Sequence, residues 1–333
     1  MRFNTSPMKS SDRPKIFTWH IHGSYLFYLA QGNYDIYIPT KEQKTEGYYG
    51  RGETFPFEDN VHEIPAELVK DEQFDCILFQ TNQNYQRDQF EILSAEQREL
   101  PKIYLEHDPP RQHPTDTKHI IDSKDILLVH VTHFNRLMWD NNKTPTKVIE
   151  HGVTTPNIPY SGEISKGIVV INHLPSRGRL LGLDIFLDVR KHIPLDLVGM
   201  GTGELGLGEV LHPQLPEFIS KYRFFFNPIR YTSHGLAVCE AMMLGIPVIG
   251  MATTEMPTVV NNGVNGYIHA DISKLIEKMK QLLDDQALAQ KMGIEGRKTA
   301  LERYHINRFV SDWELTFQEV IQRHSSRKTA IEV

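Results

Sequence analysis

The sequence predicts an α/β protein of two domains, each built around a parallel β-sheet, with a cleft between them. Three observations support this fold class. The chain has 333 residues, which suits two domains because one domain usually holds roughly 100 to 200 residues. Short apolar runs alternate with longer amphipathic stretches along most of the chain, a pattern typical of parallel sheets covered by helices. Residues 152–167 are rich in Pro and Gly and separate two such series.

The first domain is expected over residues 14–150, where apolar runs bounded by turn residues predict strands. Gly23 and Ser24 follow the first run at a strand-to-helix turn, and His107 and Asp108 lie at the end of the fourth. The carboxyl ends of parallel strands border the ligand cleft in such sheets, so we expect these residues to lie at the cleft. The predicted strands lie within residues 15–23, 34–39, 75–80, 102–107, 126–131 and 147–153.

The second domain is expected over residues 151–305, followed by a C-terminal helix over 306–323. After Gly266, apolar residues recur every three or four positions and predict an amphipathic helix from Ile272. The last helix carries an apolar stripe long enough to cross back and pack against both domains. That stripe consists of Ile306, Phe309, Val310, Trp313, Phe317, Val320 and Ile321. The predicted strands of this domain are residues 167–173, 194–199, 223–228 and 247–251.

The composition argues against several classes of protein. The net charge of −6 comes from mixed acidic and basic residues without a basic block, so we expect no nucleic-acid partner. Cys76 and Cys239 are the two cysteines, too few for a disulfide framework or a cysteine-based zinc site. No stretch reaches the roughly 18 apolar residues that a membrane span requires. We therefore expect a soluble, cytoplasmic protein, with peripheral membrane contact left open.

Residues 236–244 predict a helix that is apolar on every side except at Glu240. An ionised carboxylate buried without partners costs several kcal/mol, so Glu240 is expected to accept hydrogen bonds. Two ribose hydroxyls would supply such donors. The alternative is a partner arginine, and the residues alone leave both interpretations open.

Thr232, Ser233, His234 and Gly235 lie where this helix begins. The first N–H groups of a helix have no partner within it, and the helix dipole makes this end positive. A phosphate group would therefore bind there. The alternative is that Ser233 only caps the helix.

The stretch from Arg223 to Gly250 resembles the donor-binding segment of retaining glycosyltransferases of family 4, the glycosyl transferases group 1 type. That family has the GT-B fold, in which two Rossmann-like domains face a cleft. The segment normally holds two Glu residues separated by seven others; here the second is Glu240, and Thr232 occupies the position of the first. The matching residues are Gly235, Leu236, Glu240, Ala241, Met242, Gly245, Pro247, Val248 and Ile249.

The resemblance implies a hexosyltransferase-type enzyme that takes a sugar from a nucleotide diphosphate sugar, a UDP- or GDP-sugar. It would transfer the sugar with retention of configuration to a glycan, lipid-linked or small-molecule acceptor, as in polysaccharide biosynthesis. No metal ion or other cofactor is expected, and the sequence lacks the Asp-x-Asp pattern that would hold a metal-bound diphosphate. The donor-binding residues would be Gly23, Arg177, Arg179, Thr232, Ser233, His234, Gly235, Leu236 and Glu240.

Arg177 and Arg179 flank a glycine directly after an apolar strand, and guanidinium groups bind phosphate oxygens bidentately. The pair resembles the Arg and Lys with which the family holds the donor diphosphate, although Leu181 occupies the Lys position. His107 resembles the family's histidine beside the donor sugar. The resemblance thus assigns catalytic roles to His107, Arg177, Arg179 and Glu240. The alternative for the two arginines is that they are solvated loop residues.

Other functions are consistent with parts of the sequence. Gly201, Gly203 and Gly206 follow a predicted strand in the spacing of a dinucleotide-binding loop, which favours an NAD-dependent dehydrogenase. Against it, the next strand ends in Asn-Pro without the acidic residue that would hold a ribose. A sugar-nucleotide epimerase or a phosphorylase could use the same fold. Thr232 and Leu181, where the family has charged residues, keep a non-catalytic nucleotide-sugar-binding protein among the alternatives.

Overall fold

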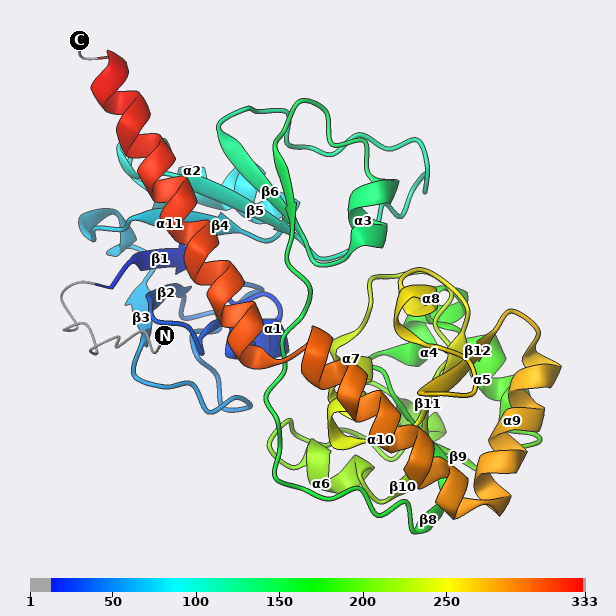
Figure 1. The fold of residues 1–333 in the computed structure, drawn as a ribbon. Coiled ribbons are helices and arrows are strands. Elements are labelled where there is room, and N and C mark those ends of the chain that lie inside the picture. The colour runs from blue at the N-terminus through cyan, green and yellow to red at the C-terminus, as the bar shows by residue number, and fades with distance from the viewer. Residues whose placement is uncertain (1–12, 332–333) are drawn as a thin grey trace, which may run out of the picture.

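The computed structural model describes residues 13–331, which form two α/β domains with a parallel sheet each (Figure 1). The first domain has a seven-stranded sheet in the order β3-β2-β1-β4-β5-β6-β7, and the second a five-stranded sheet in the order β12-β11-β10-β8-β9. Every pair of neighbouring strands is parallel. The predicted fold class, two Rossmann-like domains with parallel sheets, is confirmed.

The elements of the first domain alternate mostly between strand and helix. They are β1 (Lys15–Thr18), α1 (Gly23–Leu29), β2 (Asp35–Thr40), β3 (Val61–Pro65), β4 (Cys76–Phe79), α2 (Gln89–Ile92), β5 (Lys102–Glu106), β6 (Ile126–His130), α3 (His133–Met138) and β7 (Thr146–Val148).

The second domain begins its sheet with β8 and ends with α10, and the C-terminal helix α11 (Ile306–Ile331) follows. Its elements are β8 (Ile164–Val170), α4 (Leu174–Arg177), η5 (Gly178–Leu181), α5 (Leu183–Val189), β9 (Leu195–Val198), η6 (Gly203–Leu205), α6 (Leu215–Ile219), β10 (Tyr222–Asn227), α7 (Leu236–Leu244), β11 (Val248–Met251), α8 (Met256–Val259), β12 (Gly266–His269), α9 (Ile272–Asp284) and α10 (Gln286–Arg303).

The central strands of both sheets are buried on both faces. Every residue of β4 and of β10 is buried, which explains why these strands are mostly apolar in sequence rather than alternating. One apolar cluster includes Tyr25 of α1, Val238 of α7 and Phe309 of α11. The cores of the two domains are therefore continuous beneath the cleft.

Most sequence predictions of elements agree with the structure. Helix α7 has the predicted bounds, 236–244, and α9 begins at Ile272 as expected. Strands β3 and β12 were not predicted, and β8 begins at Ile164 rather than at residue 167. The C-terminal helix α11 runs to Ile331, past its expected end at 323.

The chain crosses between the domains at two places that lie side by side (Figure 1). One is the segment between β7 and β8, and the other joins α10 to α11; Val153 and His305 form a parallel bridge between them. Helix α11 then packs on the first domain, where Trp313 Nε1 donates to Tyr25 Oη at 3.1 Å. Within residues 13–331, no helix combines the length and apolar character needed to cross a membrane.

Candidate active site

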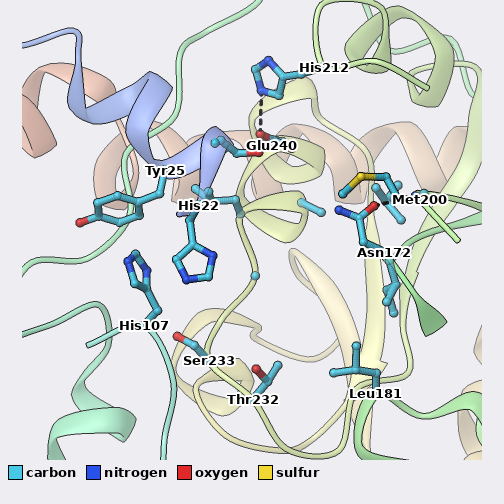
Figure 2. A pocket seen from close by; sticks show the side chains of 18 of the residues that line it. His22, Tyr25, His107, Asn172, Leu181, Met200, His212, Thr232, Ser233 and Glu240 are labelled. Carbon is cyan, nitrogen blue, oxygen red and sulfur yellow. Dashed lines mark hydrogen bonds and ion pairs between the residues drawn. The ribbon is translucent and has the colours of Figure 1, made fainter. Parts of the chain in front are cut away.

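A cleft of about 550 Å³ separates the two domains, and both contribute to its walls. Figure 2 shows side chains from both domains converging there, among them His107 from the first and Glu240 from the second. Of the residues proposed from sequence, Arg179 alone does not line this cleft. The predicted residues that do line it are Gly23, His107, Arg177, Thr232, Ser233, His234, Gly235, Leu236 and Glu240.

Glu240 is largely buried on α7, with 14% of its side chain exposed. Its Oε1 accepts a hydrogen bond from Tyr28 Oη at 2.7 Å and lies 3.3 Å from His212 Nε2. Burial, followed by the Glu240 carboxylate, raises the pKa of Tyr28 well above 10.0, which keeps its hydroxyl a donor. Among the described residues, no arginine pairs with Glu240, and its Oε2 has no hydrogen-bond partner. That oxygen is therefore available to a ligand.

The loop before α7 is tied to the first domain. Thr232 Oγ1 donates to Asp108 Oδ1 at 2.8 Å, and Asn135 Nδ2 donates to Ser233 Oγ at 3.3 Å. The residue that precedes α7 is Gly235, and no side chain caps the helix. The alternative that Ser233 caps α7 is therefore wrong, and the first N–H groups of the helix receive no side-chain cap.

His234 contributes its main chain rather than its side chain to this loop. Its carbonyl oxygen accepts a hydrogen bond from His151 Nε2 at 2.7 Å. The imidazole is 4% exposed, neither ring nitrogen has a partner, and the ring stacks on Tyr304 at 5.6 Å. Burial lowers the pKa of His234 to about 3. The side chain therefore stays neutral and brings no charge to the cleft.

His107 lies directly after β5 and has a defined tautomer. Its Nε2 is 3.0 Å from Gln80 Oε1, while Gln80 Nε2 donates to Thr18 Oγ1 and to the Trp19 carbonyl oxygen. Because this network directs the amide oxygen of Gln80 at His107, it assigns the proton to Nε2 and leaves Nδ1 as an acceptor. Burial, followed by the neighbouring His22, lowers the pKa of His107 well below 6.5. The ring is therefore neutral at physiological pH.

The two arginines proposed for the diphosphate lie in different environments. Arg177, at the end of α4, lines the cleft. Arg179, in η5, has 75% of its side chain exposed outside the cleft and pairs with Asp184. The expected position beside the diphosphate is therefore not observed for Arg179, because the turn of η5 directs it to Asp184. Leu181 is 2% exposed and supplies no charge.

Two further residues of the site were missed by sequence reasoning. Arg111 lines the cleft from the loop after β5, and its Nη2 donates to Asp108 Oδ2 at 2.6 Å. Gln80 follows β4 and orients His107. Gln80 ends one predicted strand and Arg111 comes shortly after another, at the edge where ligands bind in parallel sheets, and that position was the available signal.

The glycine-rich loop after β9 does not have the geometry of a dinucleotide-binding loop. Gly203 begins η6, a 3-10 turn of three residues, whereas a dinucleotide-binding loop leads into a helix whose N-terminus holds the pyrophosphate. Residues 13–331 contain no group of three or more His, Cys, Asp or Glu side chains placed to hold a metal ion.

Comparison with known sequences points to glycosyltransferases. A family described as glycosyl transferases group 1 matches residues 190–285. N-acetyl-alpha-D-glucosaminyl L-malate synthase of Bacillus anthracis is 31% identical over 98 residues, which cover 29% of this chain and 26% of that protein. The capsular polysaccharide biosynthesis glycosyltransferase CapM of Staphylococcus aureus is 25% identical over 190 residues, 51% of this chain and 48% of CapM. The chain thus matches about a quarter and about half of these two relatives.

Solved structures match nearly the whole chain. Sucrose-phosphate synthase from Thermosynechococcus elongatus aligns with a TM-score of 0.70 and 14% identity, over 93% of this chain and 100% of that one. HepE from Anabaena in complex with UDP-glucose aligns with a TM-score of 0.64 and 16% identity, over 94% and 99%. At this level of identity the likeness concerns the fold. The chain therefore has the GT-B fold, and its residues 190–285 match the family described as glycosyl transferases group 1.

Proposed function

We propose that the chain is a glycosyltransferase that moves a sugar from a nucleotide diphosphate sugar to an acceptor bound on the first-domain side of the cleft. One observation carries this proposal. The interdomain cleft gathers Glu240, Arg177 and the start of α7 on one wall and His107 on the other. The match of residues 190–285 to glycosyl transferases group 1 supports the same activity.

Each group on the second-domain wall has a role in this proposal. The free Oε2 of Glu240 accepts hydrogen bonds from ribose hydroxyls, and Arg177 binds the diphosphate bidentately. The backbone N–H groups from Ser233 to Leu236 contact phosphate or sugar at the positive end of α7. Together they stabilise the charge that develops on the leaving diphosphate, so the proposed reaction uses no metal ion.

The donor and the stereochemistry are part of the same proposal. A UDP-sugar is the donor we favour, because HepE, which shares the fold, was solved with UDP-glucose. We propose retention of configuration, with the sugar beside His107 and the leaving phosphate acting as base. The acceptor is a glycan, a lipid-linked sugar or a small molecule. Two relatives have names that fall within this range: CapM is named for capsular polysaccharide biosynthesis, and the other for the synthesis of a glucosaminyl L-malate.

A thermal-shift titration tests the donor site. UDP-, GDP-, ADP- and dTDP-sugars, with NAD and NADP, are added to the parent and to Arg177→Ala, Glu240→Ala and the control Arg179→Ala. A ligand at 100 times its Kd stabilises a protein by about 2.7 kcal/mol. We expect one sugar nucleotide to raise the Tm of the parent and the control but not of the other two variants. A shift with NAD or NADP alone would contradict the proposal.

Product analysis separates the transferase from its relatives on the same fold. Release of nucleoside diphosphate that depends on an added acceptor, together with a glycosylated product, supports a transferase. An isomerised sugar nucleotide would indicate an epimerase, and a sugar phosphate formed with inorganic phosphate would indicate a phosphorylase. Donor binding without any turnover would indicate a non-catalytic binding protein, the alternative raised by Thr232 and Leu181.

A further inference from the structure

The second-domain wall has little positive charge for a ligand with a diphosphate. Arg179 lies outside the cleft and Leu181 is apolar. Among the described residues that line the cleft, Arg111 and Arg177 are the Lys or Arg side chains, and they come from different domains. A diphosphate carries more than one negative charge and is best held by several charged donors.

Arg111 is held close to the second domain by the loop that carries it. Its guanidinium donates to Asp108 Oδ2 at 2.6 Å, and Asp108 Oδ1 accepts from Thr232 Oγ1 at 2.8 Å. The next contact is made by Tyr231 Oη, which donates to the Pro110 carbonyl oxygen at 3.0 Å. Asp108 and Pro110, which both precede Arg111, are thus fixed against the loop that precedes α7.

The two guanidinium groups line the same cleft, and their like charges repel each other. Burial, followed by the charge of Arg111, lowers the pKa of Arg177, and Asp108 partly offsets this effect. Asp108 pairs with Arg111 at 2.6 Å, so its carboxylate offsets only part of the positive charge of the two arginines. An anion placed between Arg111 and Arg177 would relieve the remaining repulsion and would gain hydrogen bonds from both.

We propose that Arg111 is a second diphosphate-binding side chain, supplied across the cleft by the first domain and acting together with Arg177. This inference rests on the proposed function, because it takes a nucleotide diphosphate sugar as the ligand. The diphosphate then bridges the two domains. Donor binding is thereby coupled to closure of the cleft, which excludes water from the reacting sugar.

Without a ligand, Arg111 is expected to contribute little to the stability of the protein through its ion pair with Asp108. Its side chain is 51% exposed, and surface ion pairs contribute little to stability. Replacing Arg111 should therefore leave the Tm of the ligand-free protein nearly unchanged. A loss of diphosphate affinity in a variant with normal Tm would then report ligand binding rather than folding.

Isothermal titration calorimetry with UDP and UMP, and with GDP and GMP, tests the inference on the full chain. The variants are Arg111→Ala, Arg111→Gln, which keeps a hydrogen-bond donor for Asp108, Arg177→Ala and the matched control Arg179→Ala. We expect Arg111→Ala and Arg111→Gln to weaken binding of the diphosphate about 10- to 100-fold, as for lost hydrogen bonds to a charged group. The monophosphate should lose less affinity, and the control should bind like the parent.

The failures of the two proposals are distinguishable. If Arg177→Ala loses affinity for the diphosphate while both Arg111 variants bind as the parent does, the role of Arg111 is overturned and the proposed donor site stands. An equal loss for monophosphate and diphosphate would also overturn it, because Arg111 would then not read the second phosphate. If the parent binds neither UDP nor GDP, both proposals fail.

Discussion

The two walls of the cleft are built in different ways. The second-domain wall includes one contiguous stretch, from Thr232 to Ala237, which is followed by Glu240 on α7. The first-domain wall combines residues after β1, β2 and β5 that are distant in sequence, such as Gly23, Phe55 and His107. A contiguous wall can be recognised as a motif, whereas a dispersed wall exists only once the sheet has formed.

The walls also differ in how their polar groups are used. On the second-domain wall, the Oε2 atom of Glu240 is free within the described structure. On the first-domain wall, Asp108 already pairs with Thr232, and Tyr28 pairs with Glu240. We therefore interpret the second wall as the one that binds the donor and the first as the one that positions it and closes the cleft.

The largest effect is expected from removing the ribose acceptor on the second wall. Glu240→Ala should weaken nucleotide binding about 10- to 150-fold, since hydrogen bonds to charged groups contribute about 1.5 to 3 kcal/mol. Calorimetry with UMP and GMP measures this directly. Glu217→Ala, which removes an exposed carboxylate from α6, is the control and should bind as the parent does. Equal affinity of Glu240→Ala and the parent would remove Glu240 from the site.

The sequence predicted the helices and strands that depend on local patterns of residues. Helix α7 has its predicted bounds because a continuous apolar run ends at Gly245, whose φ of +80° stops the helix. The outer strands β7 and β9 were predicted, but the outer strands β3 and β12 were missed. Each is short and carries polar residues, as in the His62 and Glu63 pair of β3, so neither has the apolar run of a central strand.

Residues of both walls were predicted, among them His107 on the first, but the contacts between the walls were not. The stretch from Thr232 to Glu240 could be interpreted from spacing and burial, but the pairing of Thr232 with Asp108 joins residues far apart in the chain. Arg179 lies outside the cleft, because its direction depends on the turn η5 and on Asp184. No local pattern showed that Arg111, and not Arg179, would share the cleft with Arg177.

Two buried histidines beside the cleft, His151 and His234, should make the fold less stable in acid. Burial lowers the pKa of His151 to about 4 and that of His234 to about 3, from 6.5. As pH falls below 6.5, the unfolded chain takes up protons that the folded chain excludes, so stability is lost. The loss is roughly 2 kcal/mol for each histidine between pH 7 and pH 5.

Urea unfolding at pH 7 and pH 5 measures this loss. His234→Phe keeps a ring against Tyr304 and leaves the main-chain carbonyl of residue 234 in place. We expect the variant to lose roughly 2 kcal/mol less than the parent between the two pH values, whatever its stability at pH 7. An unchanged pH dependence would show that His234 is not held neutral.

The contact between the walls can be tested by giving Thr232 a charge. Thr232→Glu would place a carboxylate beside Asp108, where Thr232 now donates at 2.8 Å. We expect a higher KM for the donor, although glutamate is the residue at this position in the family that the segment resembles. Asp108→Asn in the same chain should partly restore the KM, with a coupling energy of about 0.5 to 3 kcal/mol.

Thr232→Ser is the matched control, because serine keeps the hydroxyl that donates to Asp108. Its KM for the donor should stay close to that of the parent. If Thr232→Glu lowered the KM, or if Asp108→Asn had the same effect in both backgrounds, the two residues would not act as a pair. The first wall would then not hold the second through this contact.

The smallest effect at neutral pH is expected from Gln80, which acts on the site through His107. Gln80→Glu would place a carboxylate against Nε2, now 3.0 Å from the amide oxygen, and a nearby negative charge stabilises the imidazolium. The pKa of His107 should therefore rise by about 1 to 3 units. The groups facing His107 are His22, His151 and Tyr25, and the histidines oppose this rise.

The pH dependence of kcat/KM measures the change. With neutral His107 as the active form, the acid limb of the profile should move to higher pH in Gln80→Glu, while the rate near pH 8 stays close to that of the parent. Asn82→Asp adds a carboxylate to the same loop without contacting His107 and should leave the limb in place. If the acid limb of the profile did not move in Gln80→Glu, the reaction would not require His107 in its neutral form.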